Sequence, residues 1–237
     1  MNYQKDKPLI GVIGRVVDNK ICLNDEIRYA VHKSGGIPTL ILPNQKIKYN
    51  NKKIKKLTNK EKKELKRIID NIDGLILQGG NTWYEFDEYI YKYALIKDIP
   101  ILGICLGMQM MCKIDVDKGK VKDNTLRNNT IINHNQNIKY VHDIKLLENT
   151  ILKKIIKKEI IKVNSRHNYH VEKLKYLKIS AYSIDGLIEG VEYYDKNFVI
   201  GLQWHPESTY DNDIYSRRIF KNFIHTCKKE EKNGLWL

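Results

Sequence analysis

The sequence contains few cysteines, and none of them is paired in the manner of a disulfide framework or a zinc motif. The four cysteines of the 237-residue chain are Cys22, Cys105, Cys112 and Cys227. Their scattered spacing argues against a small disulfide-stapled fold and against the close cysteine pairs of zinc modules. We therefore expect free thiols and a cytoplasmic location, where the environment is reducing.

Long apolar runs are also missing. No stretch approaches the roughly 18 consecutive apolar residues of a membrane helix, and the amino terminus has no apolar signal segment. Internal repeats and linkers rich in proline, glycine and serine are absent as well. These absences predict one domain over residues 1–237, with no membrane partner.

Acidic residues are scarcer than basic ones, with 28 Asp and Glu against 42 Lys and Arg and a net charge of +14. Such a charge can attract nucleic acid. The lysines gather at 46–67 and 153–162, where they alternate with Asn and Ile rather than with the aromatic residues that stack on bases. We therefore expect a solvated basic surface and no nucleic-acid partner. Contact with a polyanion stays open as the alternative.

Apolar runs and amphipathic stretches alternate in the first half of the chain, and short strands follow from residue 138. This order predicts an α/β fold with a mostly parallel central sheet flanked by helices and a smaller antiparallel region. Segment 115–137 is predicted to be a hairpin or loop, and 44–56 a loop. Strands are expected at 8–17, 37–42, 74–77, 100–104, 139–146, 160–164, 177–183, 187–194 and 198–203; helices are expected up to residue 33 after an Asn24 cap, up to residue 70 after a Thr58 or Asn59 cap, and at 83–97, 106–113, 150–158 and 214–228.

Cys105 stands where a predicted buried strand passes directly into a predicted helix, between Gly103 and Gly107. A sharp turn of this kind lifts a nucleophile out of the sheet. The free N–H groups and the dipole at the helix start favour a thiolate. Cys105 is therefore predicted to be a nucleophile, with a buried structural cysteine as the alternative. Cys112, two helical turns further on, is predicted to lie in the core.

His205, Pro206 and Glu207 follow another apolar strand. A cysteine nucleophile needs an imidazole that carries the proton and a third group that fixes the ring. We expect Pro206 to keep this segment extended, so that His205 and Glu207 project to the same side. His205 is thus predicted to be the base and Glu207 its orienting carboxylate. Capping of the following turn is the alternative role for Glu207.

Gly79 and Gly80 end a further apolar strand, where glycine lets backbone N–H groups approach a ligand closely. The N–H groups of Gly80 and Leu106 are predicted to form an oxyanion hole. Arg15, expected at the end of the first strand, would lie at the same edge of the sheet and can meet an anionic part of the substrate. A plain surface position is the alternative for Arg15.

Together these motifs resemble the class I glutamine amidotransferases, and within them the gamma-glutamyl-gamma-aminobutyrate hydrolases of the peptidase C26 family. The resemblance covers nearly the whole chain. Its most specific parts are the cysteine elbow and segment 201–207, while segments 163–167 and 185–190 favour the hydrolase branch over ammonia-donating subunits. The resemblance implies a single-domain, flavodoxin-like fold.

The resemblance also implies a reaction. Cys105 attacks a gamma-carboxamide, a gamma-glutamyl thioester forms, an amine leaves, and water then frees glutamate. No cofactor is expected. No metal is expected either, because His134, His142, His167 and His170 lack the spacing of a zinc motif. The expected substrate-binding residues are Gly79, Gln109, Asn164, Ser165, Arg166 and His167, with Arg15 on the side of the leaving group.

Three departures leave the leaving group open. Leu106 stands where the hydrolases usually have arginine, loop 81–87 lacks their usual Gly-Asp pair, and residues 167–169 read His-Asn-Tyr where the family often repeats histidine and adds glutamine. The partner expected is a small gamma-glutamyl molecule, and a homodimer stays open. Two alternative functions also stay open: a glutaminase subunit that passes ammonia to a synthase, and a non-catalytic binding protein that keeps the fold.

Overall fold

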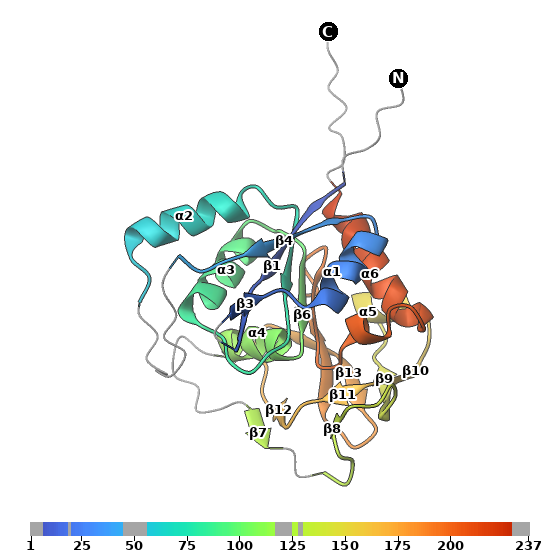
Figure 1. Ribbon diagram of the computed structural model, residues 1–237. Helices are drawn as coiled ribbons and strands as arrows, with labels where there is room; N and C mark the ends of the chain where they lie inside the picture. The colour runs from blue at the N-terminus through green and yellow to red at the C-terminus, as the bar shows by residue number, and fades with distance from the viewer. Residues whose placement is uncertain (1–6, 19, 45–55, 117–124, 128–129, 229–237) are drawn as a thin grey trace, which may run out of the picture.

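The computed structural model describes residues 7–18, 20–44, 56–116, 125–127 and 130–228. Its central layer is one nine-stranded sheet with helices on both faces (Figure 1). The strands of this sheet are β1 (Leu9–Ile13), β4 (Ile37–Ile41), β5 (Gly74–Leu77), β6 (Ile101–Ile104), β9 (His142–Leu146), β10 (Ile160–Val163), β13 (Lys178–Ser183), β14 (Ile188–Glu192) and β15 (Val199–Leu202). The helices are α1 (Asp25–Lys33), α2 (Asn59–Ile69), α3 (Glu85–Ile96), α4 (Leu106–Val116), α5 (Ile151–Ile156) and α6 (Ile214–Cys227).

The strand order is β10-β9-β13-β14-β15-β6-β5-β1-β4. The five strands from β15 to β4 are mutually parallel, and the four from β10 to β14 join them through antiparallel pairs. The expected α/β fold, with a parallel sheet flanked by helices and an antiparallel region, is therefore confirmed.

Successive side chains of a strand point to opposite faces of the sheet, so two separate apolar cores form, one on each face. In β5, Ile76 packs on the side of α1, α5 and α6, whereas Leu75 and Leu77 pack on the side of α2, α3 and α4. All four residues of β5 are buried. Since burying an aliphatic side chain contributes about 1.5–3 kcal/mol, such a strand is most stable away from the edges of the sheet, and β5 is the central one of the five parallel strands.

The order of the strands positions the functional site. The chain passes from β1 through α1 to β4 on one side, and then through α2 to β5 on the other side of β1. In open α/β sheets, ligands bind at the carboxyl ends of the strands where the order reverses in this way. The segments that follow β1, β5, β6 and β15 meet at this edge.

Most predicted elements are confirmed to within a few residues. Asn24 caps α1 through the N–H of Glu26, and Thr58 caps α2 through the N–H of Glu61. Most of the predicted loop 44–56 lies outside the described residues. Among those described, no helix is long and apolar enough to cross a membrane.

The first predicted strand was too long. β1 ends at Ile13, and residues 15–17 form β2 (Arg15–Val17), which pairs with β3 (Lys20–Cys22) in a separate hairpin. Gly14 marks the break, because a Cβ atom there would lie 2.4 Å from the side chain of Ile21. The hairpin therefore packs against the chain at this point, and Arg15 does not end the first strand.

Segment 115–137 also differs from a simple hairpin or loop. β7 (Thr125–Arg127) pairs with β12 (Tyr169–Val171), and β8 (Asn135–Gln136) pairs with β11 (Ser165–Arg166). These short strands thus join segments 125–136 and 165–171, in the lower part of Figure 1.

Asp115 fixes the end of α4 to the loop before β13. Its buried carboxylate accepts hydrogen bonds from the backbone N–H groups of Lys175 at 2.6 Å, Tyr176 at 3.0 Å and Leu177 at 3.1 Å. One side chain therefore satisfies three successive backbone donors.

We predict that Asp115→Ala lowers the free energy of unfolding by about 2 kcal/mol or more, because three partly or fully buried N–H groups lose their acceptor. Chemical denaturation measures the change. The control is Asp211→Ala, at an exposed position, which should change stability by no more than about 0.5 kcal/mol. Equal effects of the two substitutions would contradict this role of Asp115.

Candidate active site

Cys105 forms the turn between β6 and α4. Its φ angle is +50°, in the left-handed region, and its N–H donates to the carbonyl of Leu202 at 2.7 Å. A non-glycine residue held in this way costs about 1–3 kcal/mol, so the surrounding structure must enforce it. Gly107 contributes, because a Cβ atom there would lie 2.0 Å from the carbonyl oxygen of Leu77. Only glycine lets α4 start so close to β5.

His205 follows β15, the parallel neighbour of β6. The Cys105 sulfur lies close enough to its imidazole to contribute to the raised pKa of His205. Gly79 lies against both side chains: a Cβ atom there would lie 3.0 Å from Cε1 of His205 and 3.6 Å from Cβ of Cys105. Residues 100 positions apart in the sequence thus face each other, as the sequence predicted.

Glu207 completes the chain of contacts. Its Oε1 atom lies 2.7 Å from Nδ1 of His205, and its side chain is buried. The segment is not extended, however, because Pro206 begins a 3-10 helix, η1 (Pro206–Thr209). Proline is well suited to the first position of a helical turn. The predicted extended segment was therefore wrong. The predicted contact between His205 and Glu207 is present.

The protonation of His205 follows from its two neighbours. Burial lowers the pKa of His205, but the Glu207 carboxylate and the Cys105 sulfur outweigh burial and raise it to about 10. The imidazole therefore holds a proton on each nitrogen at neutral pH, one directed to Glu207. The site thus holds a proton donor next to the Cys105 sulfur.

Asn164 holds the backbone of His205 on both sides. Its Oδ1 atom accepts from the N–H of His205 at 2.8 Å, and its Nδ2 atom donates to the carbonyl of His205 at 2.7 Å. Asn164 was expected to bind substrate. In the structure Asn164 fixes the backbone of His205, and its contact with a substrate stays a prediction.

Arg15 lies beneath the predicted oxyanion loop. Its side chain is buried, forms an ion pair with Asp87 and donates to the carbonyl of Gln78. A Cβ atom on Gly80 would lie 2.9 Å from Cδ of Arg15, so the arginine supports the loop from below. Only its Nη2 atom lacks a partner within the described part of the chain. The guanidinium is thus paired mainly with Asp87, and its predicted contact with the leaving group stays a prediction.

Leu106 is the first residue of α4, where backbone N–H groups have no intrahelical carbonyl partner. Gly80 follows β5, the other neighbour of β6. The two predicted oxyanion donors therefore follow two adjacent parallel strands, β6 and β5, at the same edge of the sheet.

The remaining predicted substrate residues make contacts within the protein. The amide Nε2 of Gln109 donates to the carbonyl of Tyr169 and to Oε1 of Gln203, both at 3.1 Å. Arg166 donates to the hydroxyl of Ser208. Ser165 and His167 are buried and turn to a group of histidines around Glu189, which sequence spacing did not reveal.

Comparison with known proteins agrees with this geometry. The family model described as Peptidase C26 matches residues 82–207. A glutamine amidotransferase-like protein of Rickettsia prowazekii is 30% identical over 94% of this chain and 99% of its own length. The chain belongs to the peptidase C26 family. This C26 member is accordingly a hydrolase that acts on amide bonds.

More distant relatives divide between two kinds of enzyme. The gamma-glutamyl-gamma-aminobutyrate hydrolase of Escherichia coli is 24% identical over 69% of this chain and 75% of that enzyme. A CTP synthase of Buchnera aphidicola is 26% identical over 95% of this chain, but over only 46% of the synthase. This C26 member is thus similar both to a gamma-glutamyl-gamma-aminobutyrate hydrolase and to part of a CTP synthase.

Solved structures share the fold of this C26 member. A glutamine amidotransferase from Thermotoga maritima has a TM-score of 0.59 at 15% identity, with 94% of this chain and 100% of that chain covered. The glutaminase domain of Trypanosoma brucei CTP synthase has a TM-score of 0.63 at 17% identity, with 94% and 95% covered.

The raised pKa of His205 predicts a change of stability with pH. A folded-state pKa of about 10, against an ordinary 6.5, gives a contribution that is complete below pH 6.5 and is lost as the pH rises toward 10. The difference in free energy of unfolding between the wild type and His205→Gln should therefore shrink as the pH rises from about 7 to 10.

Denaturant titrations at several pH values measure this difference. His32→Gln, at an exposed position of α1, is the control, and its difference from the wild type should stay constant over the same range. A constant difference for His205→Gln would contradict the pairing of the imidazole with Glu207 and Cys105.

Proposed function

We propose that the protein hydrolyses the gamma-glutamyl amide bond of a small gamma-glutamyl conjugate and releases glutamate and an amine. The observation that carries this proposal is the line of contacts from Cys105 through His205 to Glu207. A sulfur nucleophile, a proton carrier and an orienting carboxylate are the groups that acyl transfer requires.

The proposed reaction has two stages. The Cys105 sulfur attacks the gamma-carbonyl carbon, and the N–H groups of Gly80 and Leu106 hold the oxyanion that develops. His205 gives its proton to the departing amine, which leaves a gamma-glutamyl thioester on Cys105. The neutral imidazole then takes a proton from water, whose attack on the thioester frees glutamate and restores the sulfur.

The nature of the amine separates two candidate functions. The similarity to the Escherichia coli hydrolase supports a free-standing enzyme that releases an organic amine. Leu106 and the similarity to CTP synthases support a glutaminase whose product is ammonia for a synthase partner. We favour the first, because segments 163–167 and 185–190 resemble the hydrolase branch. The intact Cys105, His205 and Glu207 arrangement argues against a non-catalytic binding protein.

Cys105→Ala should lower kcat for every substrate by at least roughly a thousandfold, because no thioester can form. The control is Cys22→Ala, since Cys22 is a half-buried cysteine of the β2–β3 hairpin, and activity should be retained. The measurement is glutamate release from glutamine, gamma-glutamyl-gamma-aminobutyrate and other gamma-glutamyl amines. Substantial turnover by Cys105→Ala would remove the mechanism; glutamine turnover that needs an added synthase would favour the second function.

Asn164→Ala should lower kcat by up to about a hundredfold with little change in KM, because the base loses both backbone anchors while the substrate contacts remain. The matched control is Asn168→Ala, at an exposed position of the next turn. Steady-state kinetics separate the two constants. A rise in KM at unchanged kcat would show instead that Asn164 binds substrate.

A further inference from the structure

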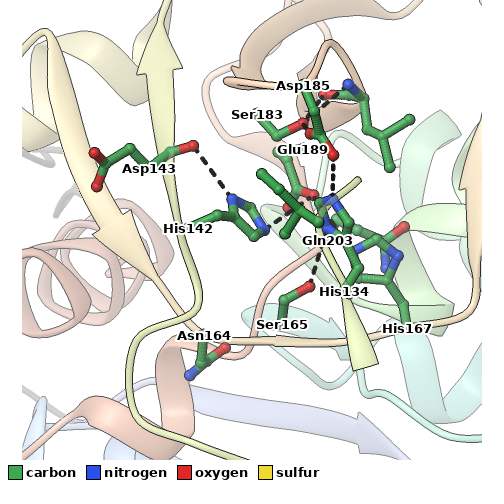
Figure 2. A network of polar contacts seen from close by, with 12 residues as sticks. His134, His142, Asp143, Asn164, Ser165, His167, Ser183, Asp185, Glu189 and Gln203 are labelled. Carbon is green, nitrogen blue, oxygen red and sulfur yellow. Dashed lines mark hydrogen bonds and ion pairs between the residues drawn. The ribbon is translucent and has the colours of Figure 1, made fainter. Parts of the chain in front are cut away.

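A second group of chemistry-bearing side chains lies outside the catalytic contacts. His134 precedes β8, His142 begins β9, His167 follows β11, and Glu189 lies in β14. All four residues are at most 4% exposed. Four parts of the chain that are distant in sequence thus bring three imidazoles and a carboxylate together in the interior, as Figure 2 shows.

The three imidazoles converge on one oxygen atom. Oε1 of Glu189 lies 3.3 Å from Nε2 of His167, 3.5 Å from Nδ1 of His134 and 3.6 Å from Nε2 of His142. These distances exceed the 2.7–3.2 Å of an ordinary N–H···O hydrogen bond. They match instead the spacing of about 3.3–3.5 Å between neighbouring ligand atoms around a tetrahedral zinc ion with bonds of about 2.0–2.2 Å.

In each imidazole, the nitrogen that points away from Glu189 contacts a hydrogen-bond acceptor, and this contact determines which nitrogen faces Glu189. Nε2 of His134 lies 2.9 Å from the Asp185 carboxylate, and Nδ1 of His142 lies 3.2 Å from the carbonyl of Asp143. Nδ1 of His167 lies 3.0 Å from the carbonyl of Tyr169. These acceptors require a proton on each far nitrogen, so a neutral ring turns a lone pair toward Glu189. Histidine ligands of metals are held in this way.

With neutral rings, the centre of the group consists of acceptors. Neither carboxylate oxygen of Glu189 has a hydrogen-bond donor among the described residues, and neither has Nε2 of His142. The Ser165 hydroxyl reaches only Nδ1 of His134, at 3.3 Å. A buried carboxylate costs several kcal/mol unless a cation compensates it. In the described part of the chain, the ion pairs of Glu189 are all with these histidines.

We propose that His134, His142 and Glu189 bind a divalent zinc ion, with His167 as the fourth ligand. Ligand atoms of the first three lie within 4.8 Å of one another. Glu189 directly, and Asp185 through His134, balance the two charges of the ion. Three imidazoles and one carboxylate form a donor set that suits zinc.

The proposed site is structural, because its side chains are buried and all four ligand positions are filled by the protein. It joins β9 and β14 of the large sheet to the segments that contain β8 and β11. Ser165 in β11 contacts His134 of the proposed site, and Asn164, directly before it in the sequence, bonds the backbone of His205. The ion would therefore also stabilise the segment that positions His205. This inference differs from the sequence-based expectation that no metal is bound.

The test measures metal directly and is independent of activity. The full chain, stripped with a chelator, is titrated with zinc sulfate by calorimetry, its thermal unfolding is followed, and bound zinc is counted by mass spectrometry of the elements. We expect one zinc ion per chain and a rise in Tm on zinc addition. With cobalt chloride, the visible absorption of tetrahedral cobalt should develop.

Substitutions at the ligands and at Asp185 should lower the affinity for zinc to different extents. Asp185→Asn should weaken zinc binding about 10- to 100-fold, as expected for loss of a group that orients a ligand, and His142→Gln and Glu189→Gln should weaken it further. His225→Gln, at an exposed position of α6, should bind as the wild type does.

If a ligand variant fails to fold, the wild-type titrations still decide. No zinc binding and no change in Tm for the stripped wild type would overturn the proposal, and would show that shared protons alone hold the cluster. Undiminished zinc binding by soluble His142→Gln and Glu189→Gln would overturn it as well.

Discussion

The pairing of β6 with β15 is the constraint on which the site depends. The two strands run parallel, with Ile104 beside Leu202, so that the residues that follow them leave the sheet at the same edge. The bond from the N–H of Cys105 to the carbonyl of Leu202 continues this ladder into the strained turn. The proposed nucleophile and base are therefore brought together by backbone hydrogen bonds of the sheet rather than by a flexible loop.

The antiparallel half of the sheet supports this arrangement from the side. Asn164 follows β10 and forms two hydrogen bonds with the backbone of His205. Gln109 of α4 donates a hydrogen bond to the carbonyl of Tyr169 in β12. The residues of the parallel half that we propose to be catalytic are thus held by residues of the other half. A buried cluster that orders segments 130–137 and 164–171 would then influence the geometry of the base without any contact to the substrate.

Local sequence patterns predicted the parts of the site that depend on local structure. A strand that leads through Cys105 into a helix, and a strand that is followed by His205, are visible in the residues themselves, because burial and turn formation act over a few positions. The parallel sheet then follows from the order of elements, since consecutive strands and helices pack in few ways. Most helix and strand bounds were accordingly correct to within a few residues.

What the sequence did not reveal depends on contacts between distant segments. The partner of Arg15 is Asp87, 72 residues away, and no spacing rule indicates this buried ion pair. The break at Gly14 arises from the packing of Ile21 in a hairpin. His134, His142 and Glu189 come from three separate segments, so the absence of a ligand motif could not exclude a metal-binding cluster. These features emerge only when the sheet is complete.

The central claim is that the Cys105 sulfur becomes acylated during turnover. Rapid quenching of the enzyme with a gamma-glutamyl amide, followed by mass spectrometry of its peptides, tests this claim most directly. The account predicts a peptide that contains Cys105 and carries the added mass of one glutamyl group, which disappears once the substrate is exhausted. Turnover of the same substrate with Cys105 unmodified at every time point would contradict it.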